Sequence, residues 1–211
     1  MCYRRIDMAK DPRRAQFDYF RTLANPYVGV TVPVDVTGVW ERSRRMGDSL
    51  FLRVLYAVVR GANAVPQLRR RIRADGTVVE YDSCPSSHIV PLPEDAYCYC
   101  TLDCRRPYGE FLPYALAEQE RARAAASLDD GDQESLFFLS CVPWFSFTSL
   151  IQPTPAPADS NPRLTWGRCE KREGRMELPL AILAHHALVD GVHIARFYEA
   201  VAAEMKALAE A

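Results

Sequence analysis

Residues 185–193 read HHALVDGVH and join a strand-like segment to a helix-like one. Residues 176–187 are typical of a buried strand, in which alternation places His186 on one face and His185 on the other. Asp190 and Gly191 break that strand, and Asp190 is the natural N-cap of the following helix. An imidazole has an ordinary pKa of about 6.5, so a histidine held in one tautomer can remove a proton near neutral pH. The stretch therefore predicts a base at a strand-to-helix junction.

Upstream of this stretch, strand-like and helix-like segments alternate and no internal repeat is visible. Asp11 predicts the N-cap of a first helix and Asp48 the N-cap of a second helix, which ends near residue 62. Asp75-Gly76 predicts a tight hairpin turn. The other predicted elements are strands at 27–34, 70–73, 77–81, 89–91 and 97–102, a helix at about 109–126, and buried strands separated by a bend within 136–151.

Composition limits the class of protein. The chain has 211 residues, which favours one domain, and 26 basic against 27 acidic residues leave a net charge of −1. A general nucleic-acid binder would carry a basic excess, and the longest apolar runs, such as residues 54–59, are too short to cross a bilayer. Residues 1–14 lack the apolar core of a secretory signal, so we expect a cytoplasmic protein without a nucleic-acid or membrane partner.

Two groups of residues each allow a structural and a functional interpretation. Seven cysteines, an odd number, favour free thiols, and the spacing of Cys98, Cys100 and Cys104 suits a strand better than a metal site. The arginines at 69, 70, 71 and 73 are interpreted as one solvated strand face, with a phosphate-binding patch as the alternative.

The nonapeptide resembles the active-site signature of the chloramphenicol acetyltransferase family. Residues 12–17 (PRRAQF) resemble the N-terminal helix of that family, residues 68–83 its hairpin, and residues 139–149 (LSCVPWFSFTS) its S-x-x-P-W strand. The resemblance implies an α+β fold in a single acyltransferase domain over residues 1–211. That fold is a two-layer α/β sandwich, with a mixed sheet and helices packed on one face.

The resemblance also implies roles for individual residues. His186 would be the general base, Ser140 the hydroxyl donor to the tetrahedral oxyanion, and Thr165 the holder of a water in the oxyanion site. Asp190 would pair with Arg13 and support the site without orienting His186. Aromatic substrate contacts fall at Tyr19, Phe20 and Tyr97, and Tyr99 stands near the pocket in place of a smaller residue.

The family mechanism implied is direct acetyl transfer from acetyl-CoA to a hydroxyl of chloramphenicol, an antibiotic-resistance reaction, without a metal. It also implies a homotrimer with each site between neighbouring subunits. Val189, Val192 and the segment 150–155 depart from the family pattern and affect the acceptor pocket. The alternatives are another alcohol acceptor or acyl chain, a catalytically silent trimeric binding protein, and a metal hydrolase that uses His185, His186 and His193.

Overall fold

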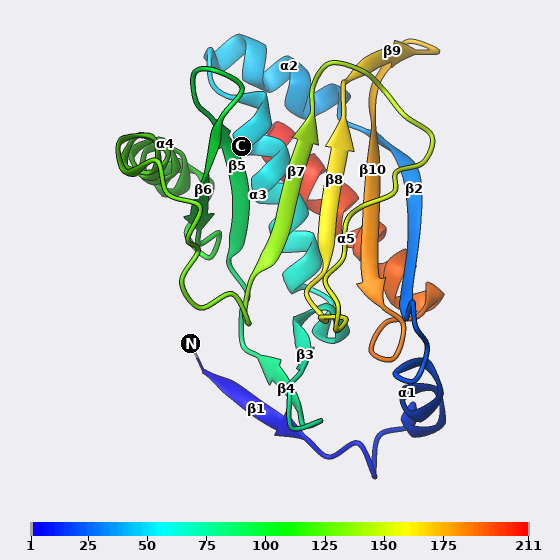
Figure 1. The fold of residues 1–211 in the computed structure, drawn as a ribbon. Coiled ribbons are helices and arrows are strands. Elements are labelled where there is room, and N and C mark those ends of the chain that lie inside the picture. Colours follow the sequence, from blue (N-terminus) through cyan, green and yellow to red (C-terminus); the bar gives the residue numbers. More distant parts are fainter. Residues whose placement is uncertain (1, 211) are drawn as a thin grey trace.

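The computed structural model describes residues 2–210 and contains a seven-stranded mixed sheet (Figure 1). Its path is β2-β10-β8-β7-β5-β6, and β9 pairs with β10. β10 is antiparallel to β2 and β8, β7 is parallel to β8 and β5, and β5 is antiparallel to β6. The strands are β2 (Tyr27–Asp35), β5 (Ser86–Pro91), β6 (Tyr97–Leu102), β7 (Phe137–Val142), β8 (Arg163–Gly167), β9 (Glu170–Arg172) and β10 (Arg175–His185).

A second, three-stranded sheet lies at one end of the first, with the order β1-β4-β3 (Figure 1). Its strands are β1 (Tyr3–Ile6), β3 (Arg70–Ile72) and β4 (Val78–Tyr81). The predicted hairpin turn between β3 and β4 is confirmed, because Gly76 adopts a φ of 78° there. Glycine occupies that left-handed region without the steric cost that a Cβ atom brings.

Helices cover one face of the large sheet, as predicted. In Figure 1, α3 and α5 lie behind the sheet and α4 lies beside β6. Gly61 of α3 lets α5 approach closely, since a Cβ atom at that position would lie 2.6 Å from Val201 Cγ2. The helices are α1 (Arg14–Phe20), α2 (Thr37–Met46), α3 (Leu50–Asn63), the 3₁₀ helix η1 (Pro66–Arg69), α4 (Tyr108–Ala125) and α5 (Gly191–Glu210).

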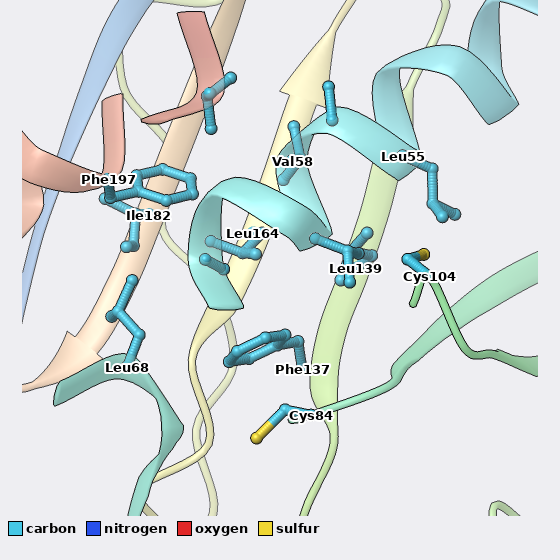
Figure 2. Packing of buried hydrophobic residues seen from close by; sticks show 14 of the residues in the cluster. Leu55, Val58, Leu68, Cys84, Cys104, Phe137, Leu139, Leu164, Ile182 and Phe197 are labelled. Carbon is cyan, nitrogen blue, oxygen red and sulfur yellow. The ribbon is translucent and has the colours of Figure 1, made fainter. Parts of the chain in front are cut away.

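The hydrophobic core fills the space between the helices and the sheet (Figure 2). Leu139 of β7, Leu164 of β8 and Ile182 of β10 are buried in it. Because successive side chains of a strand point to opposite faces, the neighbouring Ser140 and Thr165 project from the face without helices. The segment between β7 and β8 crosses that second face (Figure 1). The packing of the core therefore determines which side chains are left for a site on the other side of the sheet.

Several local predictions were wrong. The N-cap of α1 is Arg13 and that of α3 is Ser49, whereas Asp11 accepts a hydrogen bond from the Arg13 amide and Asp48 pairs with Arg53. Helix α2 was not predicted. Two or more strands were predicted within 136–151, but the structure has one there, β7, which ends at residue 142; the last predicted strand ends at 185 rather than 187.

The prediction of a solvated arginine face fails at Arg71, which is 1% exposed. Its guanidinium donates to the carbonyl oxygens of Leu68, Glu134 and Leu136 at 2.8, 2.8 and 2.9 Å. Buried donors need acceptors, and η1 and the turn before β7 supply them.

Among residues 2–210, no helix combines the length and the apolar character needed to cross a membrane.

Candidate active site

His186 is held in one tautomer by the turn that follows β10. Its backbone amide donates to the Pro26 carbonyl at 2.7 Å, and its ring Nδ1 lies 2.9 Å from the Val189 carbonyl oxygen. A carbonyl oxygen can only accept, so Nδ1 must carry the proton and Nε2 keeps its lone pair. A neutral imidazole with a free Nε2 lone pair can act as a proton acceptor.

The ring of His186 is also fixed by stacking. Phe20, the last residue of α1, lies face to face with it, with ring centroids 3.7 Å apart and 12° between the planes. Tyr19 packs edge-on against Phe20 and is 61% exposed. Two of the aromatic residues predicted to contact substrate, Tyr19 and Phe20, therefore lie beside His186. We call His186, Phe20, Arg13 and Asp190 the histidine corner.

Arg13 links α1 to the turn after β10. Its Nη1 lies 2.6 Å from Asp190 Oδ2, and its Nη2 donates to the His186 carbonyl at 3.1 Å. The Arg13 hydrogen bond holds the pKa of the Asp190 carboxyl below its usual range. No hydrogen bond joins Asp190 to the His186 ring, whose Nδ1 is already used by Val189. The ion pair therefore supports the backbone of the corner and does not form a triad with the histidine.

We expect the variants Arg13→Met and Asp190→Asn each to lower the free energy of unfolding by about 1–2 kcal/mol. The loss stays moderate because the Asp190 side chain is 42% exposed, so water compensates part of the lost charge interaction. The double variant should lose less than the sum of the two single losses, because both changes remove the same contact. Urea denaturation at one fixed protein concentration measures this, and additive losses would show that the contact does not stabilise the fold.

The other two histidines of the motif have different partners. His185 Nδ1 accepts from the Ala187 amide at 3.2 Å, and His193 Nδ1 accepts from the Asp190 amide at 3.0 Å. Burial lowers the pKa of each ring to about 4. Within residues 2–210, no three His, Cys, Asp or Glu side chains gather as a metal site. The clustered thiols of Cys98, Cys100 and Cys104 are buried.

A cavity of about 510 Å³ opens on the face of the sheet without helices. Ser140 and Thr165 lie side by side in it, because β7 and β8 pair in parallel with these residues in register. Tyr99 of β6 lines the same cavity, and Tyr97 packs near Tyr99 with ring centroids 5.8 Å apart. Ser140 is half-buried and Thr165 is buried. The remaining predicted site residues therefore gather here, away from the histidine corner.

The sequence did not point to Gln152 in particular as a site residue. The Thr165 hydroxyl donates to Gln152 Oε1 at 3.0 Å, and both residues line the cavity. The resemblance implied a water-binding role for Thr165, and here a side-chain amide from the segment between β7 and β8 accepts its proton. The only available signal was the departure of residues 150–155 from the family pattern.

Within one chain, His186 and Ser140 lie far apart. The register places Ala181 of β10 beside Thr165, and His186 follows Ala181 by five residues. Five residues of extended chain span about 17 Å, and Ser140 lies one strand beyond Thr165. His186 is accordingly absent from the residues that line the cavity. The chain therefore places His186, with its free Nε2 lone pair, at one end of the sheet and the hydroxyl-lined cavity at the middle of the sheet; we call these the two half-sites.

Comparisons with known proteins agree with this architecture. The family model for chloramphenicol acetyltransferase matches residues 1–202. The chloramphenicol acetyltransferase of Clostridioides difficile is 29% identical over 202 residues, covering 93% of each chain. That of Streptomyces acrimycini is 30% identical over 195 residues, covering 90% of this chain and 89% of its own.

Solved structures show the same fold. A chloramphenicol acetyltransferase structure superposes with a TM-score of 0.84 at 28% identity, covering 97% of this chain and all of the other. The cubic core of the pyruvate dehydrogenase multienzyme complex shares the fold at 16% identity, with a TM-score of 0.64 over 92% of this chain and 88% of its own. With a full-length family match and a strand-to-helix histidine motif in place, the chain belongs to the chloramphenicol acetyltransferase family of acyltransferases.

Proposed function

We propose that this protein is an acetyl-CoA-dependent O-acetyltransferase that acts on chloramphenicol or a similar small hydroxyl compound. The observation that carries the proposal is the tautomer of His186, because the Val189 carbonyl at 2.9 Å leaves Nε2 free to accept a proton. The family name and the relatives named for acetyl transfer to chloramphenicol support the reaction class. We propose that the chain forms one acyltransferase domain.

In this mechanism, acetyl transfer is direct. Nε2 of His186 takes the proton of the acceptor hydroxyl while the oxygen attacks the thioester carbonyl of acetyl-CoA. Ser140 donates a hydrogen bond from its hydroxyl to the oxyanion that develops there and keeps its proton. When the tetrahedral intermediate collapses, the CoA sulfur leaves and takes the proton back from the His186 imidazolium. The Val189 carbonyl accepts from Nδ1 throughout, so it stabilises the charged ring in place of a carboxylate.

The two half-sites support a site shared between subunits. A cyclic trimer joins one surface of each subunit to a different surface of the next, so it can bring the histidine corner of one copy to the Ser140 cavity of its neighbour. The subunit that contributes His186 would then also contribute Tyr19 and Phe20 to the site. Its neighbour would contribute Ser140 together with Tyr97, Tyr99 and Thr165. We therefore propose a homotrimer with three equivalent sites at its interfaces.

A second candidate keeps the chemistry and changes the acceptor. Gln152 belongs to a segment that departs from the family pattern. Its Oε1 atom accepts a hydrogen bond from the Thr165 hydroxyl. Pocket shape decides the acceptor, and a single changed contact alters discrimination by only about 1–3 kcal/mol. A silent binding protein is disfavoured, because binding alone does not require a histidine with an oriented free Nε2.

A thiol-release assay with acetyl-CoA tests the proposal. We expect CoA release that depends on chloramphenicol, and the same assay should include a panel of other alcohols. Release with another alcohol and none with chloramphenicol, at saturating acetyl-CoA, would reject the acceptor and keep the mechanism. The absence of release with every alcohol in the panel would favour the silent binding protein.

A further inference from the structure

Asp130 is a half-buried carboxylate at the wall of the Ser140 cavity. It lies in the segment between α4 and β7, and its Oδ1 accepts a hydrogen bond from Ser87 Oγ at 2.7 Å. Thr101 Oγ1 donates to the same oxygen at 3.5 Å. Two neighbouring strands, β5 and β6, thus position this carboxylate over the sheet, and within residues 2–210 no hydrogen bond uses its Oδ2.

The charge of Asp130 is not balanced by the other groups of the cavity. Asp159, the second carboxylate there, forms two hydrogen bonds with Arg163, at 2.8 and 2.9 Å. His88 is neutral near pH 7, because burial lowers its pKa to about 4. Within residues 2–210, Asp130 forms no ion pair. The cavity therefore holds one uncompensated negative charge.

Partial burial destabilises the ionised form of Asp130, whereas two hydrogen-bond donors of the protein stabilise it. Desolvation raises the pKa of the Asp130 carboxyl, while the hydrogen bonds from Ser87 and Thr101 lower it. A buried carboxylate gains most from a cation that also donates a hydrogen bond to it. Tyr99 lines the same cavity and offers an aromatic face, which also attracts cations.

The sheet register gives the spacing between Ser140 and Ser87, the residue whose hydroxyl binds Asp130. Ser87, which holds Asp130, pairs with Phe138 of the neighbouring strand, and Ser140 follows Phe138 by two residues. Two residues along a strand and one strand across correspond to about 8 Å. This is the span of a small molecule that has its reacting hydroxyl near Ser140 and a second functional group near Asp130.

We propose that Asp130 binds a protonated amine of the acceptor, so that this enzyme prefers amino alcohols, with the hydroxyl and the nitrogen several bonds apart, over neutral alcohols of the same shape. The inference rests on the proposed acetyl transfer and names the acceptor class for the same site. A neutral acceptor leaves Asp130 without a cation in the cavity, whereas an ammonium group neutralises it and donates to it.

Two alcohols of the same shape test the inference. In 4-(dimethylaminomethyl)benzyl alcohol a benzene ring separates the hydroxyl from a tertiary amine, which is protonated near neutral pH and cannot form a stable amide. In 4-isobutylbenzyl alcohol a carbon atom replaces the nitrogen. We expect the wild-type protein to prefer the amine by about tenfold, both in kcat/KM for thiol release and in Kd by calorimetry.

The variant Asp130→Asn should lose this preference, since the amide has the same shape without the charge. Asp129→Asn is the matched control. Asp129 is exposed and its Oδ1 accepts from the Gly131 amide, so this variant should keep the preference. Ser87→Ala, which keeps the charge and removes one donor, should lower the preference less than Asp130→Asn does.

The outcomes separate the two proposals. Equal use and equal binding of both alcohols by the wild-type protein would overturn the inference and leave acetyl transfer intact. A preference that survives in Asp130→Asn would also overturn it. Tighter binding of the amine, lost in Asp130→Asn but without acetylation of either alcohol, would reject the proposed reaction and retain the cation site. Light scattering of Asp130→Asn should give the wild-type mass; a change in assembly together with an unchanged preference would place Asp130 against a neighbouring subunit instead.

Discussion

Replacing His186 with alanine is expected to lower kcat/KM by about 10²–10⁴-fold, because the variant has no group to take the proton of the acceptor hydroxyl. His186→Asn should lose as much. Its side-chain amide can still donate to the Val189 carbonyl, which receives Nδ1–H in the native protein, but it offers no Nε2 lone pair. Steady-state thiol release with saturating acetyl-CoA measures the loss.

The neighbouring histidine provides the control for this experiment. His185 Nδ1 accepts from the Ala187 amide, and the Oδ1 atom of an asparagine can accept the same hydrogen bond. His185→Asn should therefore keep activity within a few-fold of the wild-type protein. Calorimetry should find CoA binding largely unchanged in both His186 variants. If His186→Ala retained activity within a few-fold of the wild-type value, His186 would not be the base.

The sequence predicted the strands better than their ends. A two-residue period marks β10 clearly. The strand ends where the His186 amide donates a hydrogen bond to the Pro26 carbonyl and the turn begins. Pro26 is distant in sequence, so no local pattern could reveal this. Arg71 shows the same limit, because its buried guanidinium depends on carbonyl groups of residues 134 and 136. A period-two pattern of arginines cannot distinguish a solvated face from one that another loop covers.

Only part of the candidate site could be predicted from the sequence. Motifs that resemble those of a family pointed to His186, Ser140 and Thr165. In the structure, His186 has a free Nε2 lone pair, and Ser140 and Thr165 line the cavity. Gln152 and Asp130 come from loops, which have no hydrophobic period and reach the cavity through the tertiary fold alone. The distance between His186 and Ser140 within one chain could not be read from local sequence patterns either, because strand order is a property of the folded sheet.

Ser140→Ala is expected to lower kcat by about 10²–10³-fold, the usual loss when one oxyanion donor is removed. The variant is well suited to a test of the shared site. Ser140 is half-buried and its hydroxyl forms no side-chain hydrogen bond with any residue from 2 to 210, so its removal should leave the fold intact. Neither Ser140→Ala nor His186→Ala alone should show more than about 1% of wild-type turnover.

Mixing these two inactive variants should restore activity if each site takes His186 from one subunit and Ser140 from the next. In a cyclic trimer reassembled from equal amounts of both chains, about one quarter of the sites combine two intact residues, so activity should rise to about one quarter of the wild-type value. As a control, wild-type chains reassembled with chains that carry both substitutions should also give about one quarter, against about one half if each site lay within one subunit. No recovery of activity in the first mixture, together with one half of the wild-type activity in the second, would place both residues of each site in a single subunit. That result would contradict the separation of about 17 Å, or five residues of strand, derived from the register of β10 and β8.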